Sequence, residues 1–203
     1  MAHQFANPSG IFGRLITANL LNRSNFKSNQ LIFDLLSIMP GSVVLEVGFG
    51  GGDLLLKIAK QNDSGTVYGL ERSLDMLHRT AKKVRQSENA ATIHLSAGVV
   101  DSLPFKDNQF DHICSVNTVY FWSDLSKCIA ELYRVTRFGG VLLLGFGDAS
   151  VLKAEGYEER GFILYTPERI RGSLIQNGFT PEQEHCMSRG KRGDFYAFKF
   201  KKT

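Results

Sequence analysis

The chain has 203 residues, 43% of them hydrophobic and 22% charged, with a formal net charge of +4. This length suits one domain with a core that needs neither disulfides nor metals, and the composition excludes a disordered chain. No apolar run is long enough to cross a bilayer, and the N-terminus lacks the features of a secretory signal. The three cysteines are scattered, so we expect a reduced, cytoplasmic protein without a thiolate metal site.

Residues 1–42 are predicted to form a helical segment ahead of the main domain. Two sets of apolar residues recur there at helical spacing: Ile11, Leu15 and Ala18, and then Leu31, Leu35 and Ile38. Such a segment acts either as a cap or lid over the substrate or as a cover for a sheet edge, and the pattern leaves both interpretations open. His3 and Phe5, near its start, are candidate substrate contacts.

From Val43 onward, short apolar runs alternate with longer helical patterns, which is typical of βα units and a parallel sheet. Strands are predicted near 43–47, 66–70, 92–96, 110–116, 139–147, 182–188 and 194–200. Helices are predicted near 53–61, 73–87, 123–137 and 166–177. The last two strands flank a glycine-containing turn and should form an antiparallel hairpin. The expected fold is α/β and doubly wound, with a seven-stranded, mostly parallel sheet.

Local signals mark several helix ends. Ser73 and Ser123 are candidate N-caps, and Thr166 followed by Pro167 is typical of a helix start.

The basic charge is concentrated at the C-terminus, because residues 186–203 hold six lysines and arginines against one aspartate. One interpretation is a patch that binds nucleic acid or an anionic membrane. The other, which is favoured, is a solvated hairpin followed by a charged tail.

The strand over 43–47 runs directly into a glycine-rich turn. Glycines lie at positions 48, 50 and 52, whereas a dinucleotide-binding fingerprint requires a third glycine at position 53, where this chain has Asp53. Acids at this helix start would repel a pyrophosphate. A ligand with cationic centres and no phosphate suits the site better, and S-adenosylmethionine has this chemistry.

The stretch Glu46–Gly52 resembles the first motif of class I S-adenosylmethionine-dependent methyltransferases, E/D-x-G-x-G-x-G. Further stretches resemble later motifs of that family: 68–73, 103–105 with 110–111, and 131–135 with 139–142. The resemblance spans about 43–147 and is nearest in style to quinone-biosynthesis-type and other small-molecule methyltransferases. It implies a Rossmann-like methyltransferase domain over 43–203, S-adenosylmethionine as the cofactor and a small-molecule acceptor.

The resemblance also implies roles for individual residues. Glu46 would orient the methionyl amine, Glu71 would bind both ribose hydroxyls, and Met76 would lie under the adenine unless it is a core residue. The implied cofactor-binding residues are Glu46, Gly48, Phe49, Gly50, Gly52, Glu71, Arg72, Met76, Gly98, Val99, Val100 and Asn117.

Two positions depart from common family patterns. Val99 stands where an aspartate often accepts from the adenine amino group, so packing and backbone groups, or Asp101 in a reshaped loop, would hold the ring. Residues 117–120 lack the two prolines common in enzymes that methylate nucleic-acid amines, which counts against N-methylation of a base and leaves RNA targets open.

Aromatic residues indicate the acceptor side. Tyr120, Phe121 and Trp122 would wall the pocket or pack in the core, and Tyr157, with Phe162 and Tyr165, would form a second wall. The five histidines show no metal-binding spacing, and no general base is assigned. Two alternatives remain: a non-catalytic S-adenosylmethionine-binding protein with this fold, and a nicotinamide-dependent oxidoreductase. The second is disfavoured by Asp53 and by the absence of a Tyr-x-x-x-Lys pattern.

Overall fold

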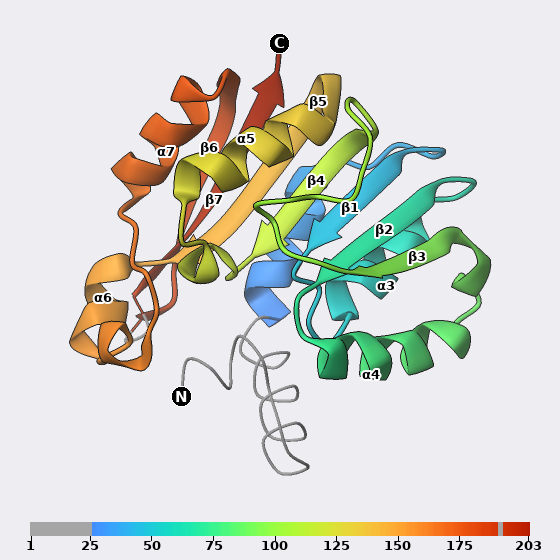
Figure 1. Ribbon diagram of the computed structural model, residues 1–203, viewed down its shortest axis with the longest axis horizontal. Coiled ribbons are helices and arrows are strands. Elements are labelled where there is room, and N and C mark those ends of the chain that lie inside the picture. The colour runs from blue at the N-terminus through green and yellow to red at the C-terminus, as the bar shows by residue number, and fades with distance from the viewer. Residues whose placement is uncertain (1–25, 191–192) are drawn as a thin grey trace.

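The computed structural model describes residues 26–190 and 193–203, and within them the chain forms one seven-stranded sheet (Figure 1). The strands are β1 (Val43–Val47), β2 (Thr66–Glu71), β3 (Ile93–Ala97), β4 (Phe110–Val116), β5 (Thr136–Gly147), β6 (Phe179–Ser188) and β7 (Asp194–Lys202). Their order is β3-β2-β1-β4-β5-β7-β6. Only β7 runs against its neighbours, pairing antiparallel with both β5 and β6. The predicted mostly parallel sheet with an antiparallel C-terminal hairpin is therefore confirmed.

Helices cover both faces of the sheet. They are α3 (Asp53–Gln61), α4 (Leu74–Arg85), α5 (Leu125–Val135), α6 (Ala149–Ala154), α7 (Pro167–Gln176) and a helix over 26–36, with short 3-10 turns η1 (Ala90–Thr92), η2 (Val119–Phe121) and η3 (Glu158–Arg160). In Figure 1, α5 and α7 lie in front of the sheet, and α3 and the helix over 26–36 lie behind it. The short helix α6 was not anticipated from the sequence.

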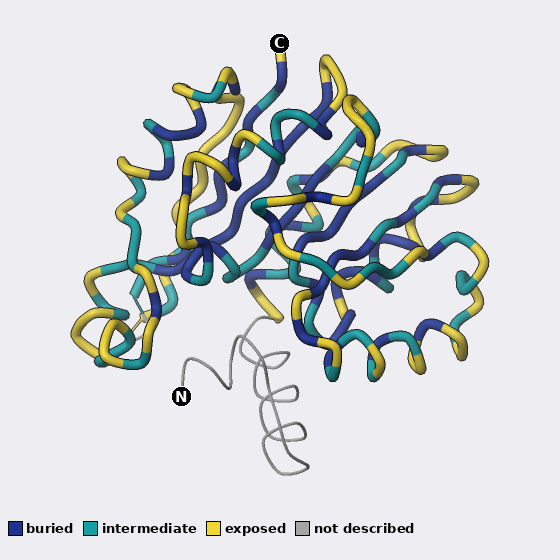
Figure 2. Tube along the Cα trace, viewed as in Figure 1, coloured by how far each residue is buried: buried dark blue, intermediate teal, exposed yellow. Residues whose placement is uncertain are grey.

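The core is correspondingly split into two clusters, one on each face. Leu45 and Val47 of β1 point into the cluster that α5 and α7 cover, whereas Val44 points into the other. This alternation of buried side chains is what a strand covered on both faces requires. In Figure 2, buried residues concentrate in the central strands, and exposed residues lie along the outer helices and the edge strand β6.

The helix over 26–36 packs directly on the sheet. Ile32 and Leu36 are fully buried against the cluster that contains Val44, whereas Leu31 and Leu35 are only partly buried beside them. The buried face is thus shifted from the predicted one, because the sheet selects the side chains that point at it. The apolar pattern at 11–18, and the candidates His3 and Phe5, lie outside the described residues.

The helix caps follow local chemistry. The side chains of Ser73 and Thr166 cap α4 and α7 as predicted. The N-cap of α5 is Asp124 and not Ser123, because the Asp124 carboxylate accepts the backbone N–H three residues later at 2.9 Å. An ionised cap also interacts favourably with the positive end of the helix dipole.

The basic C-terminal strand is largely engaged within the fold. Lys199 and Lys201 each place Nζ 3.9 Å from the carboxylate of Glu182 on β6. Lys202 is buried and donates hydrogen bonds to the Asn108 side chain and the Tyr133 carbonyl. These contacts favour a structural interpretation of the basic stretch.

Among the described residues, no helix has the length and apolar character to span a membrane, and no cluster of His, Cys, Asp or Glu could hold a metal ion.

Candidate functional site

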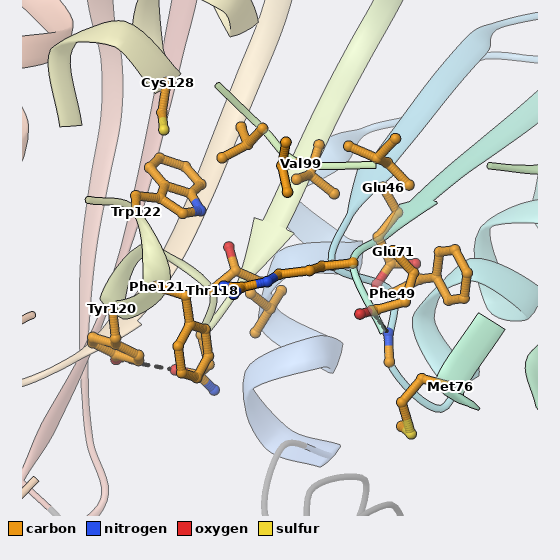
Figure 3. A pocket seen from close by; sticks show the side chains of 18 of the residues that line it. Glu46, Phe49, Glu71, Met76, Val99, Thr118, Tyr120, Phe121, Trp122 and Cys128 are labelled. Carbon is orange, nitrogen blue, oxygen red and sulfur yellow. Dashed lines mark hydrogen bonds between the residues drawn. The ribbon is translucent and has the colours of Figure 1, made fainter. Parts of the chain in front are cut away.

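A cavity of about 680 Å³ opens where β1, β2 and β4 end, the edge at which open α/β sheets bind ligands (Figure 3). Its two ends differ in chemistry. We call one the acidic end, formed by Glu46, Asp53 and Glu71, and the other the aromatic end, formed by Tyr120, Phe121, Trp122, Tyr157 and Phe162. Figure 3 shows Glu46 and Glu71 on one side of the cavity and Tyr120, Phe121 and Trp122 on the opposite side.

Most of the residues predicted from sequence line this cavity. All the predicted cofactor-binding residues except Gly52 do so: Glu46, Gly48, Phe49, Gly50, Glu71, Arg72, Met76, Gly98, Val99, Val100 and Asn117. The predicted acceptor-side residues Tyr120, Phe121, Trp122 and Tyr157 line it as well. One connected space therefore joins the two groups, and their binding roles stay predictions.

The turn after β1 needs glycine for two different reasons. Gly48 has a φ of 77°, and a Cβ there would overlap Thr118, so only glycine allows this approach to the loop after β4. Gly52 also has a positive φ, but a Cβ there would overlap Thr80 of α4. Gly52 is therefore required for packing between the turn and α4, and it does not line the cavity as the motif had suggested.

Glu46 is the most strongly perturbed group of the acidic end. Its side chain is 4% exposed, and Oε2 has no hydrogen-bond partner among the described residues. Burial, followed by the charges of Glu71 and Asp53, raises the pKa of Glu46 from 4.5 to about 8. A cationic ligand group beside Glu46 would oppose all three effects, so this site fits a cation far better than a phosphate.

Glu71 is held in place by backbone donors. Its Oε2 accepts the Gly50 N–H at 2.9 Å, and its Oε1 accepts the Ser73 N–H at 2.8 Å. Burial raises the pKa of Glu71, and these hydrogen bonds oppose the rise. A carboxylate offers about four lone-pair sites in all, so the group can still accept from a ligand hydroxyl.

The loop after β3 forms the apolar wall beside the acidic end. Val99 lines the cavity, and its side chain is 45% exposed. The Asp101 carboxylate forms an ion pair with Lys127 of α5, with 3.7 Å between Oδ2 and Nζ. Glu131 and Arg134 of α5 fix the part of the loop that follows. The Glu131 carboxylate accepts the N–H of residue 103, and Arg134 donates to the carbonyls of residues 103 and 105. The E-x-x-R spacing thus has a structural cause.

The aromatic end is held together by hydrogen bonds and ring contacts. The Tyr120 hydroxyl accepts the Gly147 N–H and donates to Asn117 Oδ1 at 3.3 Å, and burial raises its pKa to about 12. The Phe162 ring lies 4.9 Å from the ring of Phe121 and 4.9 Å from that of Tyr157. These aromatic residues belong to the core and line the cavity at once, so the two interpretations of the sequence do not exclude each other.

Sequence reasoning missed several lining residues, among them Asn29, Leu152, Glu155 and Arg189. None has a local signal, because each reaches the cavity only when a distant segment folds back. The segment after α6 is tied down by hydrogen bonds that no pattern reveals, such as that from the Tyr165 hydroxyl to the Trp122 carbonyl at 2.6 Å.

Comparison with known proteins gives a consistent picture. A family model described as a methyltransferase domain matches residues 45–144. The uncharacterized methyltransferase YdaC of Bacillus subtilis is 29% identical over 126 residues, which are 62% of this chain and 67% of that protein. The ubiquinone/menaquinone biosynthesis C-methyltransferase UbiE of Geotalea daltonii is 32% identical over 109 residues, 53% of this chain but only 46% of that protein.

The fold has close counterparts among solved structures. Geranyl diphosphate C-methyltransferase from Streptomyces coelicolor, solved with Mg²⁺, geranyl diphosphate and S-adenosyl-L-homocysteine, superposes with a TM-score of 0.79. The alignment covers 98% of this chain and 87% of that one at 11% identity, which speaks for the fold alone.

Proposed function

Since this chain belongs to the class I S-adenosylmethionine-dependent methyltransferases, we propose that it transfers a methyl group from S-adenosylmethionine to a small-molecule acceptor. The observation that carries the proposal is the pairing of a buried, acidic end with an aromatic end in one cavity. Bound there, S-adenosylmethionine supplies a methyl group activated by a sulfonium. Because the methyl group would already be activated for transfer, the protein's main task would be alignment of the acceptor.

Different residues of the chain bind different parts of the donor in this proposal. Glu46 faces the ligand with a buried carboxylate, which favours the ammonium of the methionyl part. Glu71 offers its two oxygens to the ribose hydroxyls, and Val99 and Met76 provide apolar surface for the adenine. Asn117, which directly follows β4, lines the cavity, and its Oδ1 accepts a hydrogen bond from the Tyr120 hydroxyl.

The aromatic end excludes water from the acceptor. Trp122 and Tyr120 are almost fully buried while lining the cavity, so their contact surface is already desolvated and in place. Water exclusion and alignment are what an in-line displacement needs from an enzyme. We include in the proposal that residues 1–42 form an N-terminal cap, whose helix over 26–36 packs on the sheet, and that residues 43–203 form the catalytic domain.

Calorimetric titration tests the proposal against its rivals. S-adenosylhomocysteine should bind to the full-length chain and NADH should not, because Asp53 stands in the first turn of α3, where a pyrophosphate would be bound. Binding of NADH alone would refute the proposal.

An acceptor screen, read out as S-adenosylhomocysteine release from labelled donor, then separates an enzyme from a non-catalytic binding protein. Donor binding without turnover of any small molecule in a broad screen would favour the binding protein. The E46Q variant is the matched control, since it retains the cavity's shape while losing the charge that holds the donor.

A further inference from the structure

Thr80 of α4 is tied to the glycine-rich turn after β1. Its side chain is fully buried, and its hydroxyl donates a hydrogen bond to the Gly50 carbonyl at 2.8 Å. Its methyl group lies elsewhere, because a Cβ on Gly52 would overlap Thr80 Cγ2. The two branches of the side chain therefore have separate tasks: the methyl group packs against the turn, and the hydroxyl holds one of the turn's carbonyls.

Gly50 links Thr80 to the cavity. Gly50 lines the cavity, and its N–H donates to Glu71 Oε2 at 2.9 Å while its carbonyl accepts from Thr80. Its φ of 48° lies in the left-handed region, which glycine adopts without steric penalty. Since glycine also populates many other conformations, the N–H stays directed at Glu71 only while other contacts restrict the turn. The hydrogen bond from Thr80 is such a contact.

Both oxygens of the Glu71 carboxylate depend on α4. Oε1 accepts the N–H of Ser73, which is the N-cap of α4, at 2.8 Å. Oε2 accepts the N–H of Gly50, whose carbonyl is held by Thr80 farther along the same helix. One helix thus orients the carboxylate by two routes, directly through its first turn and indirectly through Gly50.

A second side chain of α4 contacts the same turn, but in a wetter environment. Lys83 Nζ donates to the Gly51 carbonyl at 2.6 Å and lies 3.3 Å from Asp53 Oδ1. The Lys83 side chain is 46% exposed, so water can replace much of what it offers. Thr80 is buried and its β-branched side chain is restricted in χ1, so its loss would leave the Gly50 carbonyl without an equivalent donor.

Resting on the proposed function, we infer that Thr80 is a positioning residue for the donor's ribose. Its hydroxyl acts through Gly50 to hold Glu71 Oε2 where the ribose hydroxyls bind. Hydrogen bonds weaken steeply as their angles worsen, so a carboxylate that is free to turn binds a hydroxyl less well. The effect falls on the ribose, because the proposed contacts of the adenine and the methionyl amine include Val99 and Glu46, which Thr80 does not orient.

Four side chains at position 80 separate the hydroxyl from the methyl group. The wild type has both, T80S keeps only the hydroxyl, T80V keeps only the methyl group, and T80A has neither. Calorimetry on the full-length proteins measures the affinities for S-adenosylhomocysteine and for its dideoxyribose analogue, which lacks both ribose hydroxyls. The ratio of these affinities is the ribose preference.

The ribose preference should follow the hydroxyl. It should be at least about tenfold in the wild type and T80S, and about threefold or less in T80V and T80A. S87A is the matched control, because it removes another hydrogen bond from a side-chain hydroxyl to a backbone carbonyl, that from Ser87 to Val84 after the end of α4. It should keep the wild-type preference.

Several results would overturn the inference. One is the absence of a ribose preference in the wild type, and another is an undiminished preference in T80V and T80A. An equal loss of affinity for both ligands would mean that Thr80 only supports the fold, and a loss in T80S as large as in T80V would assign the effect to the methyl group. If T80V does not fold, T80S and T80A decide, since they differ only in the hydroxyl. Failure of the wild type to bind S-adenosylhomocysteine would refute the proposed function itself, whereas intact binding with an unchanged preference in the variants would refute this inference alone.

Discussion

Replacing Glu46 with glutamine should change how the stability of the protein depends on pH. Burial first, and then the charges of Glu71 and Asp53, raise the pKa of Glu46 from 4.5 to about 8. Between these values the folded protein keeps a proton that the unfolded chain has already lost. Folding therefore takes up a proton in this window, and the free energy of unfolding falls as the pH rises through it.

The size of the effect follows from the same values. The interval from 4.5 to about 8 corresponds to about 5 kcal/mol of stability lost when the whole window is crossed. Between pH 5 and pH 7 the loss from this one group is roughly 2 to 3 kcal/mol. The side chain is only 4% exposed, so solvent screening does not reduce this figure much. Glutamine has nearly the same shape and cannot ionise, so E46Q should lack this loss.

The assay is urea unfolding of the ligand-free protein at a series of pH values between about 5 and 7. Other groups titrate in both proteins, so the difference between wild type and E46Q isolates Glu46. E88Q, which removes an exposed carboxylate, is the control and should follow the wild type. Parallel stability curves for wild type and E46Q would refute the reasoning, because they would mean that Glu46 ionises like an exposed carboxyl.

Four further predictions concern the ligand sites. S-adenosylhomocysteine binding at pH 7 should release up to about one proton from Glu46 in the wild type and none in E46Q, as measured by calorimetry in buffers of different ionisation enthalpy. Glu71→Ala should weaken donor binding at least about tenfold in a folded protein, and unchanged affinity would remove Glu71 from the site. Val99→Ala should lower the affinity for the donor modestly, and Asp101→Asn should change it little. A large loss of donor affinity in Asp101→Asn would instead mean that Asp101 contacts the adenine. Deletion of residues 1–22 should spare most donor binding and abolish methyl transfer, and full turnover in the truncated chain would mean that the segment is only a cover.

Much of the fold and the acidic end could be predicted because the relevant signals are local. The aliphatic run of β1, the glycines after it and the acid of β2 lie within short stretches, and strand and helix preferences act over the same range. Thr166 and Ser73 were identifiable as caps because a cap bonds to its own helix. Glu46 and Glu71 come together because parallel neighbouring strands end at the same edge.

Tertiary packing decided the remaining features. Gly52 was assigned to the ligand from its spacing, but the position of Thr80 on another helix determines why it must be glycine. The raised pKa of Glu46 arises from burial and from carboxylates on β2 and α3, neither of which a motif encodes. Arg189 lines the cavity only because β7 folds back between β5 and β6 and places the Phe195 ring beside its guanidinium. Local sequence specifies elements and turns, whereas charges and walls contributed from distant segments exist only once the sheet has been assembled.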